Sequence, residues 1–305
     1  MAERPPYVRQ RRQRGVAHRI APIVGILLAA GAVAAVAWGV TKVAGNDDAT
    51  PPPTTSSSSL PQKPTARIVF PEGFTRKDMA KRVTAVNKIA KDKRGIDAAK
   101  LTAKRYLAAS VKGPIPTDFN GQKMPNLEGF LFPATYEFTE DTTSRALVLD
   151  QLDAFDEAWA DVDLKYAKSK NLTAYDVLII ASMIEKEVVV PKERPLVSAV
   201  IYNRLHNGMA LGIDATIRYG LDIPPTEPIH QSELESDSPY NTRCPTCTGL
   251  PPTPISNPGL ASIQAAAHPA KVDYLYFVRK PDCKHHFFTA SADEFNAYPR
   301  GGLQC

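Results

Sequence analysis

A single glutamate at the end of an apolar run is the strongest candidate for chemistry in this sequence. Residues 177–184 read VLIIASMI, and Glu185 follows them directly. On a helix, Glu185 would share a face with Ala181, Ser182 and Val188, which lie three or four positions away. Partial desolvation on that face would raise the pKa of Glu185. A carboxyl group that stays protonated near neutral pH can act as a general acid.

A core helix is expected to position this glutamate. Thr173 and Asp176 stand in the capping-box pattern, which predicts the start of a helix. Because residues 177–184 are apolar nearly all round, that helix must be buried. Glu187 lies two positions beyond Glu185 and would face away from it, so a structural or solvated role is expected for Glu187.

The remaining patterns predict an α+β fold. Short strands are expected around residues 68–70, 274–278 and 286–289, and the aromatic stretch 126–138 is expected to be a strand or an extended rim. Helices are expected after the cap at Thr75, over 144–167, over 193–207, from about 257 to 268, and after Ser291. Residues 87–125 are Lys-rich and give no clear assignment.

The charge distribution argues against a nucleic-acid partner. The chain has 305 residues, with 37 Lys and Arg against 32 Asp and Glu, a formal net charge of +5. Residues 1–19 alone carry six Arg against one Glu, so residues 20–305 are balanced. Without a net basic charge on the body of the protein, we expect no nucleic-acid binding.

The N-terminal region predicts a single membrane anchor. Residues 20–40 contain no charged side chain, and a helix of that length spans roughly 30 Å, the thickness of a bilayer core. The Arg-rich tail at 1–19 predicts a cytoplasmic N-terminus, with everything after Thr41 on the outer side. A cleaved signal peptide is the alternative. Residues 41–66, rich in Pro and Ser, are expected to form a solvated linker.

Ten ordered blocks around Glu185 carry a family resemblance. They are FPEG (70–73), EGFLFP (128–133), ASMIEKE (181–187), IYNRL (201–205), GIDATIRYG (212–220), SPYNT (238–242), GLPP (249–252), ISNPG (255–259), AAAHPA (265–270) and YLYFV (274–278). Over residues of about 67–298 the chain resembles the MltG/YceG-like endolytic murein transglycosylases.

The resemblance implies cleavage of the β-1,4 bond between N-acetylmuramic acid and N-acetylglucosamine, which ends the growth of nascent glycan strands. Glu185 matches the family's catalytic glutamate, the first Glu of its EKE block. A small LysM-like unit at 67–125, abbreviated here, would precede a catalytic domain at 126–305. Peptidoglycan strands, the plasma membrane and, from the family alone, peptidoglycan synthases are the expected partners. No cofactor or metal is expected.

Five residues in the matched blocks are candidates for contact with the sugar chain. They are Asp214, Tyr240, Asn241, Thr242 and Asn203. An aromatic ring beside amide and hydroxyl groups suits stacking and hydrogen bonding to N-acetyl groups, whereas helix capping or turn formation is the structural alternative for Asn203 and Asp214. Glu128 is expected to anchor the turn beside Phe130, with a direct site role as the alternative.

Two other functions are compatible with the same residues. A hydrolase usually needs two carboxyl groups, and a muramidase would use Asp214 as the partner of Glu185. A lytic transglycosylase needs only one, because the C6 hydroxyl of the muramic sugar attacks its own C1. A membrane-tethered protein that only binds glycan, through the unit near residue 67, is the non-enzymatic alternative.

The four cysteines are expected to form disulfides in an extracytoplasmic protein. Cys244–Cys247 and Cys283–Cys305 are the favoured pairs, the second because it would fasten the C-terminal tail to the strand region. Four cysteines allow three connectivities, so the pairing stays open. A zinc site built on Cys244 and Cys247 is the alternative.

Overall fold

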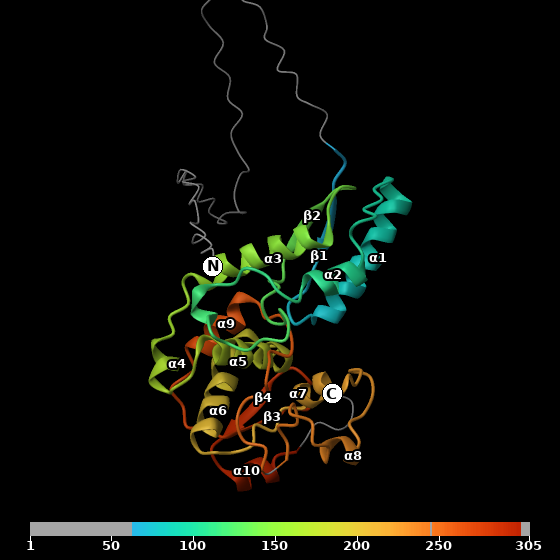
Figure 1. Cartoon of the computed structure of the whole chain (residues 1–305). Coiled ribbons are helices and arrows are strands. Elements are labelled where there is room, and N and C mark those ends of the chain that lie inside the picture. The colour runs from blue at the N-terminus through green and yellow to red at the C-terminus, as the bar shows by residue number, and fades with distance from the viewer. Residues whose placement is uncertain (1–62, 245, 300–305) are drawn as a thin grey trace, which may run out of the picture. The chain divides into compact units, whose positions relative to one another are not determined.

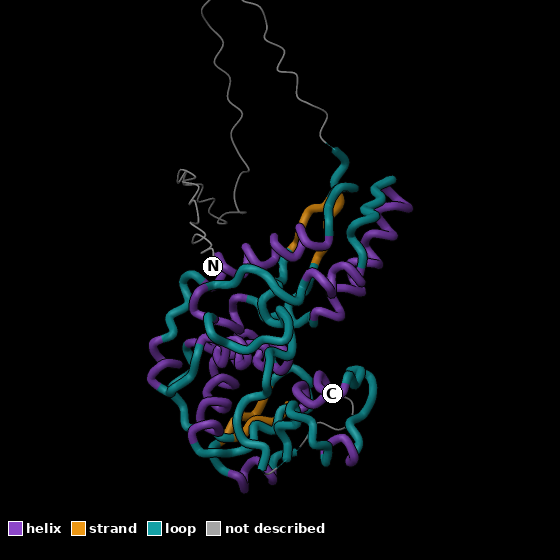
Figure 2. The backbone as a smooth tube through the Cα atoms, viewed as in Figure 1, coloured by secondary structure: helices purple, strands orange, loops and turns teal. Residues whose placement is uncertain are grey.

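Helices are the main regular structure of the described chain, with long loops and two small sheets among them (Figures 1 and 2). The computed structural model describes residues 63–244 and 246–299, which all lie in one compact unit spanning 59–305. The helices are α1 (Arg76–Arg94), α2 (Ala103–Ala109), α3 (Ser144–Trp159), α4 (Lys165–Ser169), α5 (Ala174–Glu187), α6 (Arg194–His206), α7 (Asp214–Leu221), α8 (Gln231–Leu234), α9 (Leu260–Ala267) and α10 (Ala292–Ala297).

The predicted α+β class is confirmed by two antiparallel two-stranded sheets. Strand β1 (Ala66–Val69) pairs with β2 (Thr135–Phe138), and β3 (Tyr276–Arg279) pairs with β4 (His286–Thr289). Side chains on β1 alternate between buried and exposed, as expected for a sheet with one face on the core. Strand β1 precedes residue 125 and β2 follows it, so this sheet joins the two predicted domains. The division of the chain at residue 125 stays a prediction.

The predicted membrane anchor lies outside the described residues. The predicted tail at 1–19, the span at 20–40 and most of the linker at 41–66 belong to this part. Among residues 63–244 and 246–299, every helix is too short or too polar to cross a bilayer.

Helix α5 begins as its sequence predicts. Thr173 Oγ1 accepts a hydrogen bond from the Asp176 N–H at 3.2 Å, and Asp176 Oδ2 accepts one from the Thr173 N–H at 2.7 Å. This reciprocal capping satisfies two N–H groups at the start of the helix. Residues 177–184 are all buried, and α5 packs against α6, α7 and α9. The predicted core helix is therefore confirmed.

The predicted helix over residues 144–167 is wrong at its C-terminal end. Helix α3 ends at Trp159, and a separate short helix, α4, starts at Lys165. Asp163 Oδ1 accepts a hydrogen bond from the Lys165 N–H at 2.9 Å. Such local bonding by Asp competes with helix continuation, which explains why the chain breaks between the two helices.

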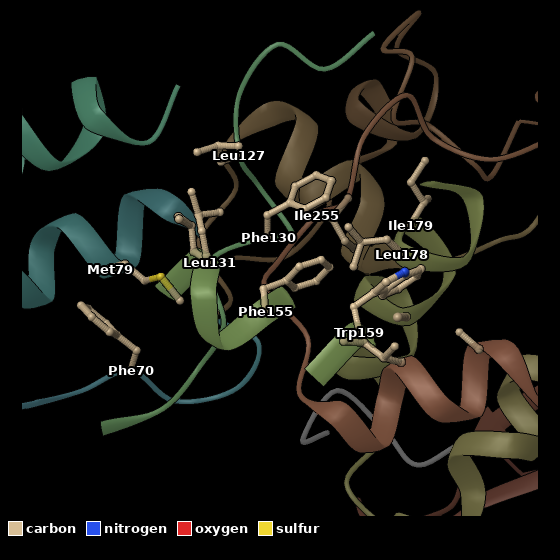
Figure 3. Packing of buried hydrophobic residues seen from close by; sticks show 14 of the residues in the cluster. Phe70, Met79, Leu127, Phe130, Leu131, Phe155, Trp159, Leu178, Ile179 and Ile255 are labelled. Carbon is tan, nitrogen blue, oxygen red and sulfur yellow. The ribbon is translucent and has the colours of Figure 1, made fainter. Parts of the chain in front are cut away.

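One continuous core connects the N-terminal elements to α5 (Figure 3). Its buried side chains include Phe70, Met79, Phe130, Leu131, Phe155, Trp159, Leu178 and Ile255. Phe119 lies at the centre of an aromatic group and contacts Phe130 with ring centroids 4.8 Å apart. This shared core fixes the N-terminal turn at residues 71–73 against the C-terminal end of α5.

Candidate active site

Glu185 lies on the last turn of α5, and its side chain is only 6% exposed. Its Oε2 atom accepts a hydrogen bond from the Gly259 N–H at 3.1 Å. The Oε1 atom lies 3.8 Å from Nη2 of Arg194, and Arg194 Nε donates to Ser262 Oγ at 3.0 Å. The carboxyl group is therefore held at one oxygen and faces a single guanidinium at the other.

A second carboxyl group, on Glu72, lies beside this pair. Both glutamates approach Gly259: its N–H bonds to Glu185, and a Cβ added to it would overlap the Glu72 carboxyl group. Desolvation and then the charge of Glu185 raise the pKa of Glu72, while Arg194 opposes both effects. Because Glu72 is itself exposed, it can exchange protons with solvent.

The backbone on both sides of Glu185 approaches it closely. Gly73 has a φ of 77°, a conformation that favours glycine, and a Cβ added there would lie 3.6 Å from Glu185 Cγ. The Gly73 N–H donates to the Asn257 carbonyl at 2.9 Å. The turn that carries Glu72 is thereby bonded directly to the loop that carries Gly259.

Asn257 holds three segments together behind the carboxyl groups. Its buried side chain accepts hydrogen bonds from the N–H groups of Gly129 at 2.9 Å and Leu131 at 3.0 Å. Its Nδ2 donates to the Phe74 carbonyl at 2.9 Å and to Glu128 Oε1 at 2.8 Å. Ser182 on α5 fixes the same loop, because its Oγ accepts the Ile255 N–H at 3.0 Å.

Glu128 is buried behind the site and bonds to three segments around it. This agrees with the anchoring role expected for it. The buried carboxylate accepts hydrogen bonds from the Arg76 N–H at 2.9 Å, from Asn257 and from the Tyr219 hydroxyl at 3.1 Å. Burial raises the pKa of Glu128 to about 7, although these hydrogen bonds lower it.

The stability of the protein should therefore depend on pH through Glu128. The pKa of this group rises from an ordinary 4.5 to about 7 on folding, so the folded state retains a proton that the unfolded state has lost. The contribution of Glu128 to stability should be largest below pH 4.5 and fall as pH rises to 7, by at most about 3 kcal/mol.

Urea unfolding of the Glu128→Gln variant at a series of pH values between 4.5 and 7 tests this prediction. The variant should be less stable overall, because an amide cannot accept all the hydrogen bonds, but its pH slope should be shallower than that of the wild type. Equal slopes in the two proteins would show that Glu128 stays ionised in the folded state throughout this range.

Asp214 and Glu187 lie in a separate charged cluster. Asp214 begins α7 and forms an ion pair with Arg243, with more than half of its side chain exposed. Desolvation and then the charge of Asp214 raise the pKa of Glu187 to about 7, and Arg279 opposes this. Glu187 is half-buried, and its carbonyl accepts a hydrogen bond from Arg279 Nη2 at 3.2 Å.

The loop residues proposed for sugar contact bond largely to the protein itself. Asn241 is buried, and its Nδ2 donates to the carbonyls of Leu234 at 2.8 Å and Ser236 at 2.9 Å. Thr242 is also buried, with its Oγ1 2.9 Å from Thr216 Oγ1. These two side chains fix the loop against α7 and α8, and their contact with substrate stays a prediction.

Tyr240 and Asn203 are held in similar ways. The hydroxyl of Tyr240 lies 2.8 Å from Thr253 Oγ1. On α6, Asn203 Nδ2 donates to the carbonyls of Val272 and Tyr274, both at 2.9 Å. Both amide hydrogens of Asn203 are therefore used within the protein, and the contact of Tyr240 and Asn203 with substrate stays a prediction.

Cavity size does not identify the site. One surface hollow of about 450 Å³ lies between β1, β2 and α1, and one of about 700 Å³ is lined by residues 111–113, 115 and 122–127. Neither is lined by Glu185, so the site rests on the two carboxyl groups and Arg194.

The three cysteines that the structure describes are oxidised. Cys244 and Cys247 form the favoured disulfide, with Cα atoms 5.1 Å apart. Because both sulfur atoms are used, the alternative zinc site loses two of its ligands. Cys283 is also disulfide-bonded, and its expected partner, Cys305, lies outside the described residues.

Glu72, Arg194 and Gly259 were not among the site residues predicted from the sequence. Glu72 and Gly259 stood in two of the matched blocks, FPEG and ISNPG, but were not assigned a role. Arg194 lies outside the blocks. Its signal would have been an arginine at the start of the helix that follows the EKE block, where a cation can face Glu185.

The fold and this site together define an α+β protein with a glutamate pair of the kind used in acid–base chemistry. The model of the YceG-like family matches residues 53–300. The chain therefore belongs to the YceG-like family.

Two relatives named endolytic murein transglycosylase are similar in sequence to this chain. The protein from Bacillus subtilis (strain 168) is 36% identical over 178 residues, which is 58% of this chain and 48% of the relative. The protein from Streptococcus pneumoniae (strain ATCC BAA-255 / R6) is 35% identical over 234 residues, 72% of this chain and 41% of the relative. The chain thus spans less than half the length of each.

A solved structure also resembles this chain. The crystal structure of a YceG-like protein from Listeria monocytogenes matches with a TM-score of 0.62 at 30% identity, and the match covers 77% of this chain and 76% of that one.

Proposed function

We propose that this protein is an endolytic lytic transglycosylase. It cleaves the β-1,4 bond between N-acetylmuramic acid and N-acetylglucosamine in peptidoglycan, leaves 1,6-anhydro ends and thereby ends strand growth. The observation that carries this proposal is the setting of Glu185, a nearly buried carboxyl group on a rigid core helix with one oxygen bonded to the Gly259 N–H. The names of its relatives support the reaction type.

Glu185 would act first as an acid and then as a base. The protonated carboxyl donates its proton to the glycosidic oxygen as the bond to C1 breaks. The C6 hydroxyl of the muramic sugar then bonds to C1, and its proton passes to the Glu185 carboxylate. Arg194, 3.8 Å away, can balance the negative charge between these two steps. No water is consumed, and Glu185 ends as it began.

Glu72 favours one alternative, a muramidase-type hydrolase. In a hydrolase, a second carboxyl group activates water or forms a covalent intermediate. Asp214 was the expected second group, but it pairs with Arg243, whereas Glu72 lies beside Glu185. Mass spectrometry of the muropeptides released from sacculi separates the two reactions, since 1,6-anhydro ends support the lyase and reducing ends support the hydrolase.

The proposed setting is the outer face of the plasma membrane. The apolar span at 20–40 would anchor the chain with its N-terminus in the cytoplasm, and the linker at 41–66 would keep the site near newly made strands. Peptidoglycan strands would be the substrate, and the synthases that make them would be neighbours.

Replacing Glu72 with Gln should change the pH dependence of cleavage. Desolvation and then the charge of Glu185 raise the pKa of Glu72, which shows that the two carboxyl groups repel each other when both are ionised. Removing the Glu72 carboxyl group should therefore move the alkaline limb of the kcat/KM profile to lower pH, by up to about one unit. The exposed Glu140→Gln variant is the matched control and should keep the wild-type profile. An unshifted limb in Glu72→Gln would remove Glu72 from this role.

A further inference from the structure

Residues 20–305 have no net charge, but their positive and negative side chains are unevenly distributed along the chain. Residues 63–125 carry 15 Lys and Arg against 5 Asp and Glu, whereas residues 126–305 carry 15 against 24. The first segment is therefore +10 and the second −9. Such a separation of charge along one chain indicates that the basic segment meets an anionic surface.

Much of this positive charge lies on α1, which carries eight Lys and Arg against two Asp. Lys81, Lys88 and Lys93 are exposed and form no ion pair with any described residue. Two other lysines on the helix do pair: Lys77 with Asp222 at 2.9 Å and Lys91 with Asp97 at 2.6 Å.

A hollow of about 450 Å³ at the C-terminal end of α1 combines this charge with apolar surface. It is lined by Arg67, Ile89, Lys93 and Arg94, among others, and Ile89 is 54% exposed. Arg67 is paired with Glu137 at 3.1 Å, so Lys93 and Arg94 supply the excess charge. An exposed aliphatic side chain among basic groups is typical of surfaces that enter a lipid headgroup layer.

The hollow also lies where the chain arrives from its predicted anchor. Thr65 and Ala66 are part of its lining, and Arg94 Nη1 donates to the Thr65 carbonyl at 3.1 Å. Residues 45–66, the Pro/Ser-rich part of the predicted linker, number 22 and would have an r.m.s. span of roughly 25 Å, so they would hold this end of α1 close to the bilayer. This position and the exposed Ile89 favour a membrane over a soluble polyanion.

We propose that the C-terminal end of α1, with Ile89, Lys93 and Arg94 at its centre, docks onto the anionic lipid surface of the membrane. The proposal rests on the membrane anchorage given under the proposed function. The opposite end of α1 follows Gly73, where an added Cβ would lie 3.6 Å from Glu185 Cγ. Because 19 helical residues span about 28 Å, docking would set the active site at most roughly 30 Å above the lipid.

Quenching by brominated lipid tests this contact. The full chain carrying Ile89→Trp is placed in bilayer discs that contain either brominated phosphatidylglycerol or brominated zwitterionic lipid, and the signal of the wild-type chain is subtracted. Tyr166→Trp, at a site 39% exposed on α4, is the matched control. We expect quenching of the tryptophan at position 89 only in anionic discs, with loss at high salt and no quenching at position 166.

Removing the two basic groups should weaken docking strongly. With Ile89→Trp as the probe, Lys93→Ala with Arg94→Ala should lower the ratio of docked to undocked protein about 30-fold, on the basis of about 1 kcal/mol per basic side chain at an anionic surface. Absence of quenching in anionic discs overturns the proposal, as does an emission change produced only by soluble polyphosphate. Glycan cleavage is assayed on the same samples. If the Ile89→Trp chain cleaves glycan but shows no quenching in anionic discs, the docking proposal is refuted and the proposed function is unaffected.

Discussion

Replacing Glu185 with Gln is expected to lower the rate of glycan cleavage about a thousandfold. The amide is nearly the same shape as the carboxyl group, but it can neither donate the proton to the leaving oxygen nor accept one from the C6 hydroxyl. The side chain can still accept the hydrogen bond from Gly259, so the fold should survive. Release of soluble muropeptides from purified sacculi, measured over time, gives the rates.

Glu187→Gln is the matched control for this experiment. It makes the same chemical change on the same turn of α5, but Glu187 faces Asp214 and Arg279 rather than Arg194. This variant should keep most of the wild-type rate. If Glu185→Gln retained wild-type cleavage, the enzymatic role of Glu185 would be lost, and a glycan-binding protein without activity would become the better account.

Replacing Asn257 with Ala should destabilise the fold by about 3–5 kcal/mol. The side chain is fully buried and bonds four groups: the N–H groups of Gly129 and Leu131, the Phe74 carbonyl and the Glu128 carboxylate. Alanine would leave the N–H groups of Gly129 and Leu131 without a partner in the core and would remove one hydrogen bond each from the Phe74 carbonyl and the Glu128 carboxylate. An unsatisfied buried group costs more than a hydrogen bond contributes.

Urea unfolding of Asn257→Ala beside Asn120→Ala gives this difference in stability. Asn120 is exposed, and its substitution should change the free energy of unfolding by less than about 0.5 kcal/mol. A loss of under about 1 kcal/mol in Asn257→Ala would mean that the loop at 255–259 is not held as the structure indicates. The turn that carries Glu72 would then need another support.

Local patterns in the sequence were sufficient to predict the helix that carries Glu185. A capping box, an unbroken apolar run and a following glutamate lie within fifteen residues, and each acts through contacts close in sequence. Helix α3 was predicted too long for a related reason. Its apolar spacing ends at Trp159, and the local bonding of Asp163 to the backbone decides where the next helix starts.

The partners of Glu185 could not be predicted in this way, because they come from distant segments. Glu72 precedes Glu185 by more than a hundred residues, and Gly259 follows it by 74. Their meeting depends on the hydrogen bonds of Asn257, which join the turn at 71–73 to the loop at 255–259.

For Asn203, Asn241 and Thr242 the sequence was ambiguous, because their side chains fit two different roles. Amide and hydroxyl groups in a loop or near a helix end suit both sugar binding and bonding to backbone carbonyls. Only the structure shows that the Nδ2 groups of both asparagines donate to neighbouring carbonyls.

Digestion of peptidoglycan in ¹⁸O-labelled water tests the central claim most directly. If Glu185 transfers a proton to the glycosidic oxygen while the C6 hydroxyl closes on C1, the new muramic ends are anhydro sugars without label. Mass spectrometry should find these unlabelled ends with the wild-type chain and none with Glu185→Gln. Labelled reducing ends from the wild-type chain would contradict the account and identify a hydrolase.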